Sequence, residues 1–189
     1  MTAGLRLCGM GDRHGSITVE AAIVIPVVIL ILVLGLDVVR YVETSSRMHR
    51  AVAVAADLAA RNETVRDNVD FNATFANNDL AAFFTAANEV AWPNDLVARG
   101  RVYIGVFEPA TGAELWQRTG PYQLAAESRV ASLPPLPSNG TVVVAEVFYD
   151  FEPMLLDAAG FAGLADFVIY RRAFFRPRLT ALAALEEPR

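Results

Sequence analysis

The sequence predicts an α+β protein in which a long N-terminal helix crosses a membrane and then packs on a small antiparallel β-sheet domain. Three observations carry this prediction. Residues 21–36 are uninterrupted apolar sequence, residues 37–61 continue with helical amphipathic spacing, and several later segments are rich in strand-forming residues. The 189 residues leave room for one membrane element and one domain of ordinary size, about 100–150 residues.

The composition argues against several functional classes. A net charge of −5 provides no broad basic field to hold nucleic acid. Cys8 is the only cysteine, and the two histidines are His14 and His49, so the later chain cannot assemble a disulfide, a zinc set or a Cys–His pair. No Gly-x-Ser-x-Gly elbow presents a nucleophilic serine. We therefore predict a protein that is not an enzyme and binds no cofactor or metal.

Residues 1–15 are predicted to be a leader, and residues 16–39 a transmembrane helix. The leader is short and shows neither helical nor strand periodicity. A helix over residues 16–39 spans about 36 Å, enough for a bilayer core of about 30 Å. The alternative is a secretory signal peptide, whose apolar region covers about 7–15 residues and ends in a small-x-small site. Val33-Leu34-Gly35 fits such a site poorly.

Two residues inside the apolar helix are unusual. Glu20 places a carboxylate near the membrane edge, where it either snorkels to the lipid headgroups or pairs with a cation. Pro26 removes a helical hydrogen bond and clashes with the preceding turn, which predicts a kink between Ala22 and Pro26. That kink is either a harmless bend or an adjustment of helix packing.

Residues 40–61 are predicted to continue the same helix as an amphipathic segment that packs on the domain. Apolar or small residues recur at spacings of three or four, with Ser45 the one polar member. The other face is charged, and Glu43 and Arg47 have the spacing of an i,i+4 ion pair. The predicted seam comprises Val38, Val42, Ser45, Met48, Val52, Ala55 and Ala59.

Residues 62–189 are predicted to form the α+β domain. The sequence predicts a loop over residues 62–75, a helix over 79–91 capped by Asn78 or Asp79, and an irregular excursion over 120–139. A helical turn is expected over residues 154–159. Strands are predicted over residues 101–108, 114–118, 141–151 and 166–175, with the first two joined in a hairpin by residues 109–112.

Two side-chain groups of this domain have a functional and a structural interpretation. The acidic group of Asp150, Glu152 and Asp157 can hold calcium, but it lacks the spacing and glycine of a calcium loop, which favours a solvated strand end. The aromatic group can stack on a sugar, although aromatic residues in strands are more often core. Its members are Trp92, Trp116 and Tyr122.

A basic cluster lies in the last predicted strand and just after it. It either docks an acidic partner or protects an exposed sheet edge from pairing with other chains. Edge protection is the favoured interpretation. The cluster comprises Arg171, Arg172, Arg176 and Arg178.

The region around Gly15 resembles the processing site of type IV pilin-like proteins. Those proteins are cleaved after a glycine and carry glutamate as the fifth mature residue, the spacing of Gly15 and Glu20 here. The three other glycines before Gly15 lack a glutamate at that spacing. The longer stretch to Pro26, with Tyr149-Asp-Phe-Glu-Pro153 and Phe175-Arg-Pro-Arg-Leu179, more narrowly resembles the TadE-like family of the tight-adherence pilus.

The resemblance implies a minor pilin or pseudopilin, because the major fibre subunit of that system is much shorter and usually has tyrosine where this chain has Ala21. It implies cleavage between Gly15 and Ser16 by a prepilin peptidase. It also implies that Glu20 of one subunit meets the N-terminal amine of its neighbour. The implied partners are other pilins and pseudopilins, the inner-membrane assembly platform and the lipid bilayer.

Orientation also rests on the resemblance, because arginines on the two sides of the span do not decide it by the positive-inside rule. The resemblance implies a cytoplasmic leader, a single pass through the inner membrane and a periplasmic C-terminal domain, and it allows incorporation in the surface pilus. The alternative is an uncleaved, membrane-anchored periplasmic binding or sensor domain.

Overall fold

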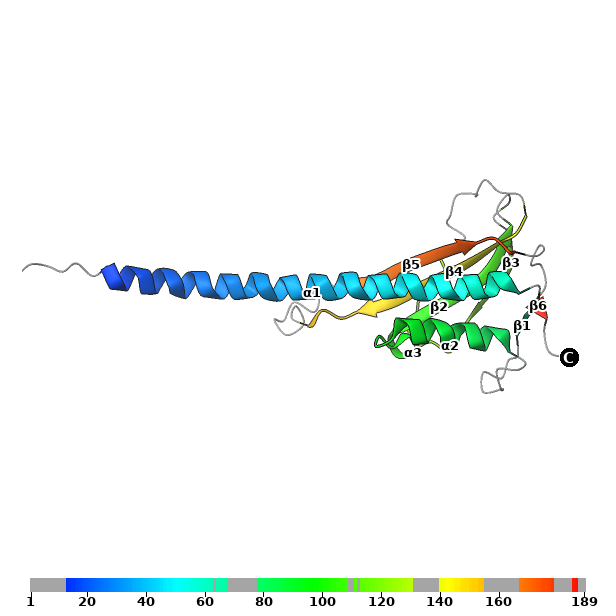
Figure 1. Ribbon diagram of the computed structural model, residues 1–189, viewed down its shortest axis with the longest axis horizontal. Coiled ribbons are helices and arrows are strands. Elements are labelled where there is room, and N and C mark those ends of the chain that lie inside the picture. Colours follow the sequence, from blue (N-terminus) through cyan, green and yellow to red (C-terminus); the bar gives the residue numbers. More distant parts are fainter. Residues whose placement is uncertain are drawn as a thin grey trace, which may run out of the picture.

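A long helix carries a small α+β domain at its C-terminal half in the computed structural model (Figure 1). The structure describes residues 13–62, 64–67, 78–108, 111, 113–130, 140–154, 167–178 and 185–186. In chain order, the elements are α1 (Arg13–Arg61), β1 (Val65–Arg66), α2 (Asp79–Ala91), α3 (Leu96–Arg99), β2 (Gly100–Glu108), β3 (Ala113–Thr119), β4 (Val142–Phe151), β5 (Phe167–Phe175) and β6 (Leu185–Glu186).

The main sheet has four antiparallel strands in the order β3-β2-β4-β5. The four predicted strands, the hairpin of β2 with β3 and the predicted helix over residues 79–91 are therefore confirmed. Asn78 caps α2, since its side chain accepts a hydrogen bond from the Ala81 amide at 2.9 Å. Most of the predicted turn at residues 109–112 and the predicted helical turn after Met154 lie outside the described residues.

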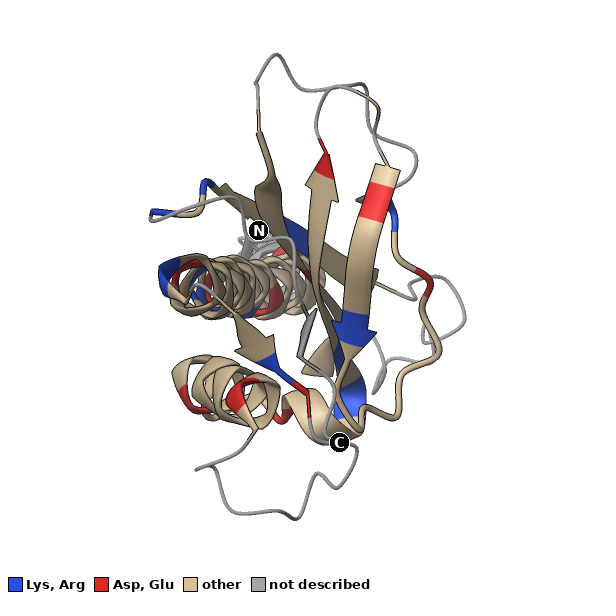
Figure 2. Ribbon diagram, turned by 90° about the vertical axis from the view of Figure 1, so that its right-hand side faces the viewer, with Lys and Arg blue, Asp and Glu red and all other residues tan. Residues whose placement is uncertain are grey.

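Helices α1 and α2 lie side by side on one face of the sheet (Figure 2). The main core fills the space between them and the sheet, and Met48, Leu80 and Ile104 are almost fully buried there. Residues 122–130 begin at Tyr122, whose side chain joins the main core, and then pass to the opposite face, where Val130 joins Phe107, Val142 and Val144 in a second cluster. We call residues 122–130 the strap. The strap belongs to the excursion predicted over residues 120–139, whose later part, residues 131–139, is not described.

Helix α1 is a single element of 49 residues that begins at Arg13, slightly before the predicted start at Ser16. It continues through Pro26, and Figure 1 shows α1 running along its length without a visible bend. The kink at Pro26 stays a prediction for the helix in a bilayer.

The domain-facing side of α1 differs from the predicted seam at its N-terminal end. Ser45 and the later seam positions are buried, but Val38 and Val42 are 62% and 60% exposed. The buried positions extend back to Thr44 and Asp37 instead, with Tyr41 half-buried between them. The predicted seam is therefore wrong at Val38 and Val42. A helix that passes from lipid to a domain has apolar residues on both surfaces, so hydropathy alone does not identify the packed side.

Three small elements were not predicted. Helix α3 is a single turn capped by Asp95, whose side chain accepts a hydrogen bond from the Ala98 amide at 3.1 Å. Strands β1 and β6 pair in parallel, which joins the segment after α1 to the C-terminal region. Each of these strands has two residues, too few to show a period.

Candidate functional site

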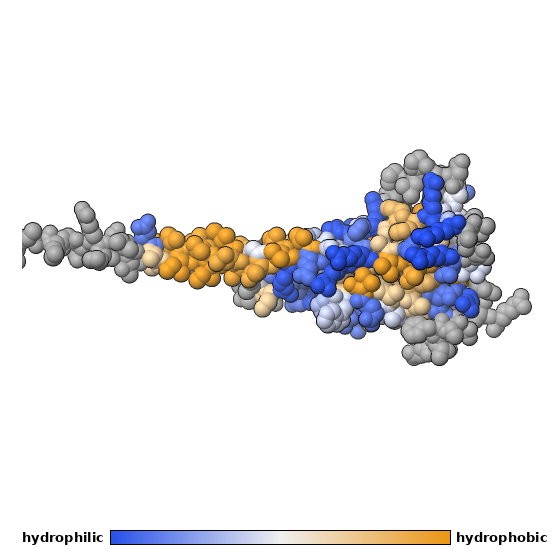
Figure 3. All heavy atoms as spheres, in the orientation of Figure 1, coloured by the Kyte–Doolittle hydropathy of each residue, from blue (hydrophilic) through white to orange (hydrophobic). Residues whose placement is uncertain are grey.

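The N-terminal half of α1 projects from the domain and presents an almost continuous apolar surface (Figure 3). From Ile23 to Leu32, the valine, isoleucine and leucine side chains are 47–65% exposed. The helix is long and apolar enough to cross a membrane, and only 6% of its most apolar stretch is buried in the described structure. A core helix of a soluble domain would be mostly buried, so this surface fits a membrane anchor.

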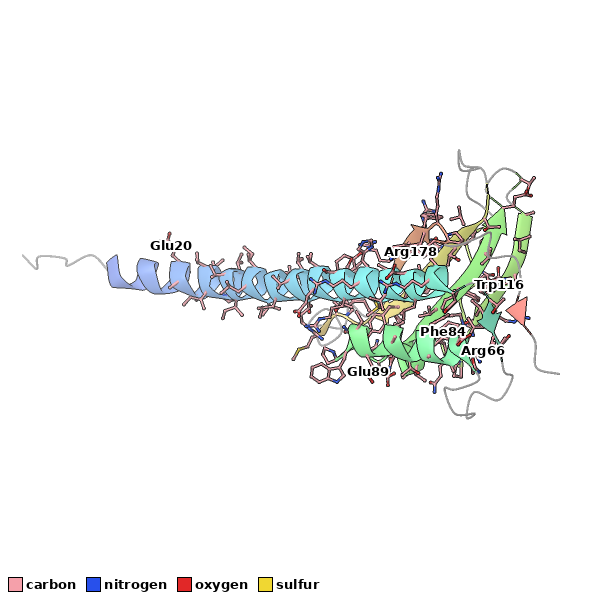
Figure 4. The ribbon with its side chains drawn as sticks, turned by 45° about the vertical axis from the view of Figure 1, so that its right-hand side comes forward. Glu20, Arg66, Phe84, Glu89, Trp116 and Arg178 are labelled. Atoms are coloured by element: carbon pink, nitrogen blue, oxygen red, sulfur yellow. The ribbon has the colours of Figure 1, made fainter. Side chains whose placement is uncertain are left out.

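Glu20 lies near the end of α1 that is farthest from the domain, and its side chain points away from the helix axis (Figure 4). It is exposed, and within the described part of the chain it makes no hydrogen bond or ion pair. Gly15 and Ser16 fall in the first turns of the same helix, so the predicted cleavage site and Glu20 belong to one element. A carboxylate on an apolar helix is costly in hydrocarbon unless a cation meets it.

A cluster of contacts fixes α1 where it leaves the domain. Asp37 is 5% exposed and accepts a hydrogen bond from the Met154 amide at 3.1 Å. The Tyr41 ring meets Phe151 and Phe167 edge-on, with centroid distances of 5.4 and 6.3 Å. These contacts join α1 to the end of β4 and the start of β5, so the direction of the projecting helix is set by the domain.

Ion pairs hold the C-terminal half of α1 against neighbouring segments. The predicted pair of Glu43 with Arg47 forms at 2.5 Å, and Arg47 also donates to the Trp92 carbonyl. Asp57 pairs with Arg61 on α1 and with Arg178 at 3.2 Å. The Arg61 hydrogen bond and charge, together with the Arg178 charge, lower the pKa of Asp57 against a smaller opposing effect of burial.

The four arginines of the predicted basic cluster do not form one surface: two of them contact α1 and two are exposed to solvent. Arg171 donates to the Ser45 hydroxyl at 2.5 Å, and Arg178 pairs with Asp57, so both of these arginines bind α1. Arg172 is exposed with its guanidinium 5.4 Å from the centre of the Phe174 ring, and Arg176 is exposed as well. Because β5 is an edge strand, this arrangement favours edge protection over a single docking surface.

The other predicted groups do not form binding sites. Asp150 and Glu152 pair with Arg99 at 3.5 and 2.7 Å, while Asp157 lies outside the described residues. No group of three or more described His, Cys, Asp or Glu side chains is placed to hold a metal ion. Trp116 and Tyr122 are buried in the core, whereas Trp92 is 71% exposed, so the aromatic group presents no shared sugar-stacking face.

The sequence interpretation missed a buried carboxylate at Glu146. This side chain is fully buried on the sheet face opposite α1, and it accepts hydrogen bonds from the Ser128 and Tyr170 hydroxyls at 2.5 Å each. The Arg129 amide is 3.2 Å from both carboxylate oxygens. Desolvation and the contact with Glu146 raise the pKa of Tyr170 to about 12. The sequence does contain a signal for this buried group, because Glu146 is the one glutamate within the most apolar of the predicted strands.

The exposed apolar helix and the α+β domain together fit a membrane-anchored, pilin-like protein. A family model described as TadE-like protein matches residues 15–57, which include Gly15, Glu20 and most of α1. The resemblance to the TadE-like family is thereby confirmed over this segment, while the domain after α1 lies outside the match. Neither the curated proteins nor the solved structures give a match to the chain.

Proposed function

We propose that the protein is a structural subunit of a tight-adherence pilus, a minor pilin or pseudopilin, rather than an enzyme. The observation that carries this proposal is the exposed apolar half of α1 with Glu20 at its far end, inside the segment that matches the TadE-like family. A prepilin peptidase cleaves after Gly15 in the proposed pathway. The mature protein then spans the inner membrane with its domain in the periplasm, where it meets other pilins, pseudopilins and the assembly platform.

The chemistry of assembly follows from the spacing of two charges. Cleavage creates an amine at Ser16, four residues before Glu20, and positions four apart lie on the same face of a helix. Both charges are costly near hydrocarbon when they have no partner. A neighbouring subunit whose helix packs on this face supplies an amine to Glu20 and receives a carboxylate for its own amine. The charge pair therefore favours an assembled state over a lone subunit in lipid.

Glu20→Gln tests this function. The variant keeps the shape of the side chain but loses its charge, and removing one member of a buried pair costs about 3–5 kcal/mol, which is at least about 100-fold in association. We expect normal cleavage after Gly15 and normal insertion, together with loss of surface pili and loss of co-purification with other pilus subunits.

Glu43→Gln is the matched control, because it removes an exposed carboxylate of the same helix that pairs only with Arg47 among the described residues. That variant should assemble normally. Normal pili and normal subunit association in Glu20→Gln would contradict the assembly role, and would instead support an uncleaved or snorkelling membrane anchor.

A further inference from the structure

We infer that the membrane-facing end of the domain is seated in the lipid interface, with an apolar groove beside α1 in contact with lipid. This inference rests on the membrane anchoring in the proposed function. The groove has a volume of about 560 Å³ and lies where α1 leaves the domain. Its lining residues are Leu34, Asp37, Val38, Tyr41, Phe151, Pro153 and Phe167.

The first argument is the length of the apolar helix. With the Glu20 carboxylate at one membrane edge, residues 21–36 cover about 24 Å before Asp37, so a hydrocarbon core of about 30 Å extends past Asp37, as does the predicted span over residues 16–39. Exposed apolar residues continue beyond Asp37 at Val38, Val39 and Val42, each 60–62% exposed. Counting to Val42 extends the apolar length to about 33 Å. A bilayer matched to this length reaches the level of the groove.

Asp37 would oppose this placement if its carboxylate met lipid, but the domain covers it. Its side chain is 5% exposed, accepts a hydrogen bond from the Met154 amide and lies 3.7 Å from the Arg40 guanidinium. Arg40 itself is half-exposed, and a long arginine side chain can extend to the headgroups. Asp37 lines the groove, but its carboxylate is almost fully covered and hydrogen-bonded there, so little of it faces lipid.

The domain surface at the same level is also apolar. Met154, Phe167 and Val168 are 66%, 44% and 45% exposed, and they follow β4 or begin β5 beside the point where α1 leaves the domain. Tyr41 packs its ring on Phe167, and tyrosine is enriched at membrane–water interfaces. The exposed Glu152 near this surface is paired with Arg99 at 2.7 Å.

A lipid surface is the occupant that this geometry selects, because the groove is continuous with the apolar helix. Leu34 and Val38 belong to both the groove and the exposed face of α1. Figure 3 shows orange, apolar residues along the helix up to the edge of the domain, where blue residues lie beside them. Any bilayer that surrounds residues 21–36 thus meets the groove next.

Nitroxide depth measurements test the inference on the full chain in phosphatidylcholine vesicles. Cys8→Ser gives a cysteine-free background, into which single cysteines are placed at Met154, Phe167 or Val168. Two further sites serve as references: Ile29 within the span, and Leu115, which is 45% exposed on β3 at the distal end of the domain. The readout is the ratio of collisions with oxygen, which concentrates in lipid, to collisions with a water-soluble nickel complex.

We expect this ratio to be several-fold higher at positions 154, 167 and 168 than at 115, and to be highest at 29. Ratios at 154, 167 and 168 equal to that at 115, with a high ratio at 29, would overturn the seating of the domain while the membrane span stands. A low ratio at position 29 as well would overturn both the seating and the membrane anchor of the proposed function.

Discussion

Glu146 shows how a single buried charge organises the side of the sheet that α1 does not cover. Its carboxylate binds Ser128 and the Arg129 amide from the strap, and Tyr170 from β5. The Arg129 guanidinium also lies 5.0 Å from the centre of the Tyr170 ring. The strap lacks regular secondary structure, so these contacts take the place of the backbone pairing that holds a strand.

Glu146→Ala should destabilise the protein and loosen the strap. The change leaves donors on the half-buried Ser128 and Tyr170 and on the Arg129 amide without their acceptor, and an unsatisfied buried donor costs about 1–3 kcal/mol, so we expect a loss of about 1–3 kcal/mol. Denaturant unfolding in detergent measures the free energy. Amide hydrogen exchange at Arg129 should accelerate, while Glu114→Ala, at an exposed site on β3, should change stability by less than about 0.5 kcal/mol. Unchanged exchange at Arg129 in Glu146→Ala would mean that other contacts hold the strap.

Tyrosine ionisation should destabilise the fold at alkaline pH. Burial raises the pKa of Tyr122 and Tyr149, and burial with the Glu146 contact raises that of Tyr170 to about 12. A group with a raised folded-state pKa contributes its full stability below the unfolded value, about 10 for tyrosine, and loses it as pH rises toward the folded value. We therefore expect stability to fall above about pH 10.

Tyrosinate absorbance between pH 9 and 12.5 checks this expectation. The chain has five tyrosines, and part of the signal should appear only near pH 12 in the folded protein. Tyr170→Phe should remove part of this late signal and make the alkaline loss of stability less steep. A wild-type titration complete by pH 10.5 without unfolding would contradict the account.

Helix α1 combines two functions in one uninterrupted element. Its N-terminal half exposes apolar residues on all sides, and its C-terminal half buries a stripe of small residues and Met48 under β4, β5 and α2. Alanines at positions 51, 55, 56, 59 and 60 let the helix approach the sheet and α2 closely. The change between the two halves occurs at Asp37 and Tyr41. Asp37 accepts a hydrogen bond from the Met154 amide, and the Tyr41 ring packs on Phe151 of β4.

Paired substitutions on α1 separate its packed side from its exposed side. Met48 is fully buried, so Met48→Ala should cost about 2–5 kcal/mol, whereas Val42 is 60% exposed, so Val42→Ala should change stability by less than about 0.5 kcal/mol. Denaturant unfolding of the detergent-solubilised chain measures both values. Equal losses of stability in the two variants would mean that Val42 packs on the domain as Met48 does, and would contradict the observed register of the helix on the domain.

The larger elements could be predicted from the sequence because their periods are long and clear. The nine residues of β2 and the ten of β4 are rich in strand formers, and the thirteen of α2 have a cap and helical spacing, so these elements could be located closely. The pairing of Val65 with Leu185 could not be predicted, because it joins two-residue strands that are distant in sequence. Val38 and Val42 were misplaced because apolar residues face both the domain and the exposed surface in this part of α1.

At the scale of the whole molecule, the domain and the two halves of α1 are arranged for different surroundings. The α+β domain buries its core against one half of α1 and leaves the other half, with Glu20 near its far end, exposed as the proposed membrane anchoring and subunit assembly require. Gly15, Glu20 and the apolar run could be identified from sequence because their spacing is local. Glu146, the groove at Tyr41 and the division of the basic cluster depend on contacts between distant segments, so they required the structure.

The mass of the mature protein tests the central claim most directly. Membranes from cells that express the chain together with its pilus machinery should yield a protein that begins at Ser16, and Gly15→Leu should yield one that keeps residues 1–15. Intact-mass and N-terminal peptide spectra distinguish the two forms. A wild-type protein that begins at Met1 or Thr2 would contradict processing as a pilin-like subunit and favour an uncleaved anchor, and one that begins near Leu36 would indicate a conventionally secreted domain.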